Sequence, residues 1–305
     1  MDHAFAAIDI GSNSTNLLIV DQSGKTLERV VRSTRLGANI ATTGELSKES
    51  IQRTLDCLGE YETLIKKRNV LHRRTVATAA CRVANNTNQF FAEVEKISGI
   101  KPELISGETE GALSFIGATS ALDEKMSTLV VDIGGASTEL MVGTETLDFA
   151  VSLPFGAVNI SEAELHRDPP RPEELTNAIS LVSDAVDDVA HNYPLIGQVD
   201  RVVGVAGTIV TVAAVEVGQK TFDPSALHKL RLSREAVEDV FRTLATEPLS
   251  DRVFNPGLPR DRADIIVGGC CVLVAVMRRL QISEIVVSQY NLLDGLISEL
   301  RKKTS

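Results

Sequence analysis

The chain has few residues of the kinds that build thiolate or imidazole metal sites. It contains four cysteines and five histidines in 305 residues, and neither type shows a paired ligand spacing. Cys270 and Cys271 are adjacent inside an apolar stretch, whereas Cys57 and Cys81 are isolated. This pattern is typical of buried thiols, which we favour over the alternative of a metal–thiolate site.

A long hydrophobic run is also missing. Apolar stretches such as Cys270–Met277 are far shorter than the roughly 20 residues of a membrane-spanning helix, and no apolar leader follows Met1. We therefore expect a cytoplasmic protein with no membrane partner. With 43% hydrophobic and 24% charged residues, the chain is typical of a globular protein, and its length predicts two domains.

Positive charge is scarce over the whole chain. The formal net charge of −10 argues against nonspecific binding of nucleic acids or membranes, because both need a positive field. The charge is unevenly spread: residues 1–105 carry 14 Lys and Arg against 12 Asp and Glu, and the remainder carries 17 against 29. A polyanionic ligand is therefore expected to contact the first third of the chain.

The most informative pattern is an internal repeat. The segment Asp9–Leu17 matches Asp132–Leu140, with the same Asp, Ile, Gly, Ser, Thr and Leu at one offset of 123 residues. Because six identities in one register exceed chance, the repeat indicates a duplicated chain. Each copy lies between two apolar runs, which predicts two strands joined by a tight polar turn.

Glycine-containing turns of this kind can bind anions. Successive backbone N–H groups at a Gly/Ser tip can form a nest for phosphate oxygens. A single copy would be interpreted as a plain hairpin turn, whereas the duplication favours phosphate binding. A third glycine segment, Gly204–Thr208, follows a β-branched strand and precedes an expected helix, whose N-terminus would offer free amides to an anion.

Acidic residues accompany both turns. Asp9 and Asp132 end their strands just before the turns, and Glu139 begins the second return strand. Carboxylates in these positions can hold Mg²⁺ through waters while the backbone binds phosphate oxygens. Alternatively, Asp9 and Asp132 only form hydrogen bonds within the turns. We favour Asp132 and Glu139 as ligands of the metal and water. Asp9 would either contact the metal as well or support the ligands that do.

Several ordered motifs resemble one known family almost from end to end. The chain is similar to the exopolyphosphatase and guanosine pentaphosphate phosphatase group, within the superfamily of sugar kinases, heat-shock chaperones and actin. The motifs that carry this resemblance are Ala7–Ser14, Arg35–Gly37, Ala77–Arg82, Ile105–Ala112, Val131–Glu139, Ser152–Ala157, Gly204–Thr208 and Asp261–Asp264.

The resemblance implies an α/β fold of two duplicated ribonuclease H-like (actin-like ATPase) domains facing across a cleft. The first domain is expected at residues 1–122 together with a C-terminal helix at 290–305, and the second at 123–289. Loops 11–14 and 134–138 are expected on opposite walls of the cleft. Longer family members carry an additional C-terminal helical domain, so we expect a minimal enzyme suited to shorter phosphate chains.

The resemblance also implies roles for individual residues. Glu110 corresponds to the catalytic carboxylate, although an acidic residue in a helix's first turn can simply favour the helix dipole. Arg82 matches a family arginine and would contact phosphate through its planar donor fork. The expected catalytic residues are Glu110, Glu139 and Arg82. The expected substrate-binding residues are Gly11, Ser12, Asn13, Ser14, Arg35, Gly134, Gly135, Ala136, Ser137, Gly207 and Thr208, of which Arg35 could equally be a solvated surface residue.

A few positions depart from the family pattern. Ala136 stands where the second loop usually has a glycine, and Asn16 stands where an arginine is common. Leu293 and Asp294 replace the usual Arg-Glu near the C-terminus. The change at Asn16 affects one expected phosphate contact.

The expected function is an exopolyphosphatase that hydrolyses terminal orthophosphate from inorganic polyphosphate by Mg²⁺-assisted in-line attack of water. A guanosine pentaphosphate 5′-phosphatase is the alternative within the same class. An ATP-dependent sugar or acetate kinase and an actin-like assembly protein stay open as alternatives, although the lack of an evident acceptor-binding insert favours hydrolysis. The expected partner is polyphosphate or guanosine pentaphosphate, and a homodimer also stays open.

Overall fold

The computed structural model describes residues 4–120, 122 and 125–304. The chain divides into two compact units. Unit 1 contains Met1–Ala121 and Tyr290–Ser305, and unit 2 contains Leu122–Gln289. Each unit is a mixed β-sheet with helices, which confirms the predicted α/β class.

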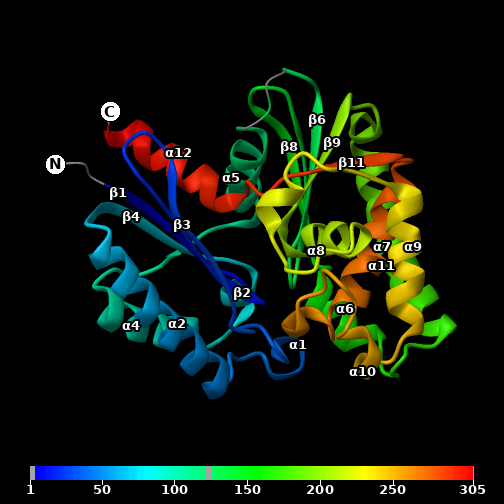
Figure 1. The fold of residues 1–305 in the computed structure, drawn as a ribbon, viewed down its shortest axis with the longest axis horizontal. Helices are drawn as coiled ribbons and strands as arrows, with labels where there is room; N and C mark the ends of the chain where they lie inside the picture. The colour runs from blue at the N-terminus through cyan, green and yellow to red at the C-terminus, as the bar shows by residue number, and fades with distance from the viewer. Residues whose placement is uncertain (1–3, 121, 123–124, 305) are drawn as a thin grey trace. The chain divides into compact units, whose positions relative to one another are not determined.

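Unit 1 is built on a five-stranded sheet with the order β3-β2-β1-β4-β5 (Figure 1). The strands are β1 (Ala4–Ile10), β2 (Ser14–Val20), β3 (Thr26–Ser33), β4 (Val70–Ala77) and β5 (Glu103–Leu104). Strand β2 is antiparallel to both β1 and β3, whereas β4 is parallel to β1 and β5 is parallel to β4. This meander followed by parallel strands is the topology expected for a ribonuclease H-like domain.

Helices cover both faces of the unit 1 sheet (Figure 1). Ala6 and Ile8 of β1 belong to the core on one face with α2 and α4, and Phe5 and Ala7 belong to the core on the other face with α5 and α12. This alternation follows from the two-residue period of a strand, and burial on both faces explains why β1 is apolar from Ala4 to Ile8. The unit 1 helices are α1 (Ile40–Thr43), α2 (Lys48–Lys67), α3 (Ala79–Val83), α4 (Thr87–Ser98), α5 (Gly107–Thr119) and α12 (Leu292–Thr304).

Two glycines allow α5 and α12 to pack closely. A Cβ atom at Gly117 would lie 1.9 Å from the carbonyl oxygen of Asn291, and one at Gly295 would lie 2.0 Å from that of Leu113. Because both obstacles are backbone atoms, neither position can hold a larger residue without separating the helices. The C-terminal helix therefore packs closely on α5 at positions where glycine has no side chain.

Unit 2 repeats this plan with one additional strand. Its six-stranded sheet has the order β10-β11-β9-β6-β7-β8. Strands β6, β7 and β8 form an antiparallel meander, β9 and β11 extend the sheet in parallel with β6, and β10 is antiparallel to β11. The strands are β6 (Thr128–Ile133), β7 (Thr138–Gly143), β8 (Leu147–Leu153), β9 (Arg201–Val205), β10 (Arg231–Ser233) and β11 (Glu284–Val287). The duplication seen in the sequence is thus a duplication of sheet topology.

A large apolar core holds unit 2 together. The most deeply buried helix is α11, in which every residue of Ile266–Met277 is buried. The α-helices of unit 2 are α6 (Ala157–Glu164), α7 (Pro172–Asn192), α8 (Ala206–Glu216), α9 (Arg234–Thr246), α10 (Leu249–Arg252) and α11 (Ile266–Arg279). Three 3₁₀ helices are η1 (Pro194–Gly197), η2 (Pro224–Leu227) and η3 (Arg260–Arg262). In the described part of the chain, no helix is both long and apolar enough to span a bilayer.

Candidate active site

In each unit, the candidate residues gather at the carboxyl ends of the parallel strands. The turn 11–14 follows β1, the residues of α3 follow β4, and α5 follows β5 in unit 1. The turn 134–137 follows β6, and the first residues of α8 follow β9 in unit 2. This edge of an α/β sheet is where loops and helix N-termini converge on ligands.

The segment that follows β3 supports the first turn by hydrogen bonds. Gly11 closes the turn by donating its N–H to the Ser14 carbonyl at 3.0 Å. The carbonyls of Ser12 and Asn13 accept hydrogen bonds from the N–H groups of Gly37 and Arg35, both at 2.8 Å. Because N–H and C=O point in opposite directions across a trans peptide, the following two amides, of Asn13 and Ser14, face away from this support.

The tip of the first turn contains buried polar side chains without partners. Ser12 and Asn13 are each only 6% exposed. Within the described residues, Ser12 Oγ and both Asn13 carboxamide atoms have no hydrogen-bond partner. Buried polar atoms are nearly always satisfied in folded proteins, so this concentration at one turn indicates a place for a polar ligand or water.

The two copies of the repeat differ at one cross-strand pair. Asp9 lies opposite Asn16 in the β1–β2 register, and Asp132 lies opposite Glu139 in the β6–β7 register. In unit 1, Asn16 Nδ2 donates to Asp9 Oδ2 at 3.0 Å. The asparagine therefore satisfies one carboxylate oxygen in the first copy, whereas the second copy places two carboxylates side by side.

Arg82 and Glu110, which are distant in the sequence, form an ion pair in unit 1. Arg82 Nη1 donates to Glu110 Oε2 at 2.6 Å and to the carbonyl of Ile105 at 3.2 Å. Glu110 lies in the first turn of α5, whose N-cap is Ser106, and its side chain is 13% exposed. Burial raises the pKa of Glu110 above its ordinary value. The Arg82 guanidinium has the opposite effect, but it is smaller than that of burial.

The second turn is supported by the start of α6. The Gly134 carbonyl accepts from Ala157 N at 2.9 Å, and the Gly135 carbonyl accepts from Val158 N at 2.7 Å. These donors belong to the first turn of a helix, where N–H groups lack intrahelical partners. The loop carbonyls thus cap the helix, and the amides that follow each carbonyl face away from it.

The third loop carbonyl, that of Ala136, is bound by a side chain. Asn159 Nδ2 donates to it at 2.8 Å. The N–H groups of residues 135, 136 and 137 therefore all face away from α6, and none of them makes a backbone–backbone hydrogen bond within the described residues. This is the arrangement of an anion-binding nest. Ala136 is not among the residues with positive φ, so alanine in place of glycine leaves the turn unstrained.

Asp132 and Glu139 lie beside this second turn. Glu139 is 2% exposed and accepts a 2.7 Å hydrogen bond at Oε1 from Ser152 Oγ. Among residues 4–120, 122 and 125–304, no three His, Cys, Asp or Glu side chains gather closely enough to hold a metal by themselves. Mg²⁺ in phosphoryl-transfer sites is held by one or two carboxylates together with substrate oxygens and waters, so the Asp132–Glu139 pair fits this ion.

Gly207 and Thr208 belong to a helix and not to a loop. Helix α8 begins at Ala206, and the Thr208 side chain packs against Gly269 of α11, where a Cβ atom would lie 2.7 Å from Thr208 Cγ2. The guanidinium of Arg262 lies directly over Gly207, with Nη1 1.9 Å from where a Cβ would be. The sequence motif at 261–264 contained this arginine, but only the fold places it at the α8 N-terminus.

The cysteines are buried thiols. All four are free and buried, and burial raises the pKa of both Cys81 and Cys270 to about 12. A thiol of such high pKa is neutral near neutral pH. This agrees with the interpretation as buried thiols.

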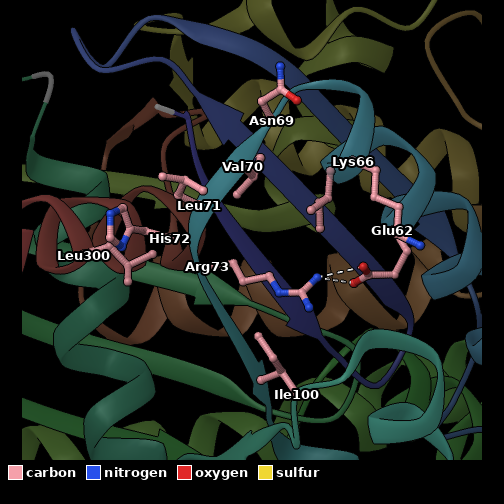
Figure 2. A pocket seen from close by; sticks show the side chains of 10 residues that line it. Glu62, Lys66, Asn69, Val70, Leu71, His72, Arg73, Ile100 and Leu300 are labelled. Carbon is pink, nitrogen blue, oxygen red and sulfur yellow. Dashed lines mark hydrogen bonds and ion pairs between the residues drawn. The ribbon is translucent and has the colours of Figure 1, made fainter. Parts of the chain in front are cut away.

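A pocket of about 740 Å³ in unit 1 is separate from these residues (Figure 2). It surrounds Val70–Arg73 at the amino end of β4, the end of the sheet opposite the turn 11–14. Figure 2 shows Arg73 and Glu62 paired within it, with Nη1 at 2.6 and 2.7 Å from the carboxylate oxygens. The volume therefore does not mark the site predicted from the motifs.

Sequence reasoning missed the glycines that support the two turns. A Cβ at Gly37 would lie 3.1 Å from Ser12 Cβ, and one at Gly156 would lie 2.6 Å from the carbonyl carbon and oxygen of Gly135. Both glycines follow a large apolar residue and precede alanine, in Leu36-Gly37-Ala38 and Phe155-Gly156-Ala157. This shared pattern of an apolar residue, glycine and alanine after each duplicated turn was a signal that could have identified them.

Comparisons with known proteins found similarity over nearly the whole chain. Residues 18–304 match the model of the Ppx/GppA phosphatase family. Exopolyphosphatase 2 of Mycobacterium tuberculosis is 32% identical over 313 residues, covering 97% of this chain and 98% of that protein.

Two further similarities extend over the whole chain. The guanosine-5′-triphosphate,3′-diphosphate pyrophosphatase of Photobacterium profundum is 31% identical over 305 residues, and the match covers 98% of this chain but 59% of that protein. The crystal structure of the Aquifex aeolicus Ppx/GppA family member has a TM-score of 0.82 at 30% identity, with 100% of both chains covered.

Proposed function

Because the chain belongs to the Ppx/GppA phosphatase family, we propose that it is an exopolyphosphatase that releases terminal orthophosphate from inorganic polyphosphate. The observation that carries this proposal is the second turn, with three successive amides available to an anion and two adjacent carboxylates beside them. The similarity to exopolyphosphatase 2 over nearly all of both proteins supports it. The family favours a phosphatase over the kinase and the assembly protein.

We assign Glu110 as the general base. Its carboxylate would take a proton from the attacking water as the water oxygen bonds to the terminal phosphorus. The bond from phosphorus to the bridging oxygen then breaks, and its electron pair stays on the shortened chain. A carboxylate whose pKa is raised by burial is a stronger base than an exposed one, and Arg82 keeps it oriented.

The glycine turns would bind the phosphate oxygens. The amides of residues 135–137 and the unpartnered side chains of Ser12 and Asn13 provide fixed donors that need no rearrangement when charge develops. Arg35, Gly207 and Thr208 are assigned to substrate binding, with Arg262 added at the α8 N-terminus.

Mg²⁺ is the proposed cofactor. Asp132 and Glu139 would hold it, with Asp9 as a further contact, and the bound ion would neutralise charge on the phosphate oxygens. The Ser152 hydroxyl fixes the Glu139 carboxylate through its 2.7 Å hydrogen bond, so this oxygen is oriented before any ion binds. Location in the cytoplasm and assembly as a homodimer stay predictions of the sequence.

One experiment tests the function directly. Orthophosphate release is measured with Mg²⁺ from polyphosphate of defined lengths and, in parallel, from guanosine pentaphosphate. We expect a higher kcat/KM for polyphosphate. Faster release from guanosine pentaphosphate would favour the second activity, which the similarity to the Photobacterium profundum protein supports. Inactivity on both substrates would reject the phosphatase assignment.

A further inference from the structure

We propose that Asn159 is a positioning residue for the second phosphate loop. Its carboxamide holds the Ala136–Ser137 peptide so that the Ser137 N–H faces the bound phosphate. This inference rests on the proposed function, because it needs a phosphate group in the loop. Asn159 lies in the first turn of α6, outside the residues that the motifs pointed to.

The start of α6 supplies four donors for three loop carbonyls, but they are not all of the same kind. Backbone N–H groups bind the first two carbonyls, with Gly134 bound by Ala157 and Gly135 bound by both Val158 and Asn159. The third carbonyl, of Ala136, is bound by the Asn159 side chain. The orientation of the last amide in the nest therefore depends on one side chain, while the first two depend on the backbone.

Both amide hydrogens and the oxygen of the Asn159 carboxamide have hydrogen-bond partners, which fix its orientation. Nδ2 donates to the carbonyls of Ala136 and Pro154, both at 2.8 Å, and Oδ1 accepts from Gly156 N at 2.6 Å. Because the two donors meet carbonyl oxygens and the acceptor meets an N–H, only one orientation of the amide satisfies all three bonds. With both amide hydrogens occupied, Asn159 acts through the loop and not by binding phosphate itself.

The corresponding carbonyls of the first loop are bound by backbone groups. The carbonyls of Ser12 and Asn13 are bound by the backbone amides of Gly37 and Arg35. Replacing Asn159 should therefore change one loop and leave the other as it is. This difference allows the role of the side chain to be separated from general binding of the polyanion.

The test compares Asn159→Ala and Asn159→Asp with the unmodified protein. Asn159→Asp keeps an acceptor for Gly156 N but loses both donors. The matched control is Gln219→Ala, because the Gln219 carboxamide also hydrogen-bonds to the backbone. Its Nε2 donates to the Asp223 carbonyl at 3.1 Å, and its Oε1 accepts from Asp223 N at 2.9 Å. Both residues lie beyond the C-terminal end of α8. Three readouts are used: amide NMR shifts of residues 135–137 on adding orthophosphate, the equilibrium Kd for orthophosphate, and kcat/KM on polyphosphate.

We expect the three loop amides of the unmodified protein to respond to orthophosphate. In both Asn159 variants the Ser137 response should be lost, and both the affinity for orthophosphate and kcat/KM should fall by about 10- to 100-fold, as when one fixed donor to an oxyanion is removed. Gln219→Ala should leave these values unchanged. A variant that only loosened the fold would lower the melting temperature without this selective loss.

Two results would overturn the inference. One is a folded Asn159→Ala or Asn159→Asp protein that binds orthophosphate with unchanged Kd, and the other is an unmodified protein whose loop amides do not respond to orthophosphate. If orthophosphate binds as expected but polyphosphate is not hydrolysed, the proposed function fails while the role of Asn159 is still decided by the Kd values. The Asp variant retains the bond to Gly156, so it provides a second test if the Ala variant does not fold.

Discussion

Replacing Gly156 with alanine should displace the second phosphate loop without changing the chemistry of any site residue. The added Cβ would lie 2.6 Å from the carbonyl carbon and oxygen of Gly135 and 2.7 Å from Ala136 N, whereas ordinary Cβ contacts begin at 3.4 Å. The loop must therefore move by about 0.8 Å, because backbone atoms cannot rotate away as a flexible side chain can. The φ of Gly156 is −147°, an extended value open to alanine, so the effect comes from space and not from backbone strain.

A displacement of this size at a catalytic loop costs on the order of 100-fold in rate. We therefore expect kcat/KM for polyphosphate to fall by about that factor in Gly156→Ala, measured as initial rates of orthophosphate release. Gly197→Ala is the matched control in the same unit, since a Cβ there would meet nothing within 4 Å. A folded Gly156→Ala enzyme with the kcat/KM of the control would refute the reasoning that this glycine sets the loop position.

The remaining predictions concern charged residues, two of them at the candidate site and two in ion pairs elsewhere. Glu110→Gln should lower kcat by about 100- to 10,000-fold while the Kd for orthophosphate changes little, because a general base is lost but the loops remain; equal losses in binding would contradict this. The acidic limb of the kcat/KM profile should lie above that of an ordinary glutamate, since burial raises the pKa of Glu110, and Arg82→Gln should move this limb to still higher pH because it removes the cation that lowers the pKa. Glu62→Gln should reduce the free energy of unfolding by about 3 kcal/mol in urea titrations followed by circular dichroism, because it leaves the largely buried Arg73 without its counter-charge. Asp239→Asn, which breaks an exposed ion pair, should cost less than about 1 kcal/mol, and equal costs would show that burial is not the deciding factor.

Local features of the candidate site could be predicted from the residues alone. The two turns, the strands before and after them, and the aspartates that precede them all lie where the repeat predicted. This succeeds because a turn of glycine and serine between two apolar runs is defined by neighbouring residues. The pairing of Asp132 with Glu139 also follows from the sequence. The two residues are seven positions apart, and a four-residue turn at 134–137 places them opposite each other on the two strands.

Other features depended on contacts between distant segments. The sequence suggested a helix N-terminus near Gly207 but contained no sign that Arg262 would cover it, because these residues belong to separate elements. The sequence also contained no sign that the Thr208 side chain would pack against Gly269 inside unit 2. Patterns in one segment describe its own conformation and say little about which side chains another segment presents to it.

The sequence by itself determined the duplication, the α/β class and the position of the two glycine turns, because periodic burial and turn chemistry depend on adjacent residues. Only the tertiary structure decided the pairing of Arg82 with Glu110 across 28 residues and the support of Ala136 by Asn159 across 23 residues. The physical reason is that a hydrogen bond needs two groups within about 3 Å, and for residues far apart in the chain that distance is set by how the elements pack.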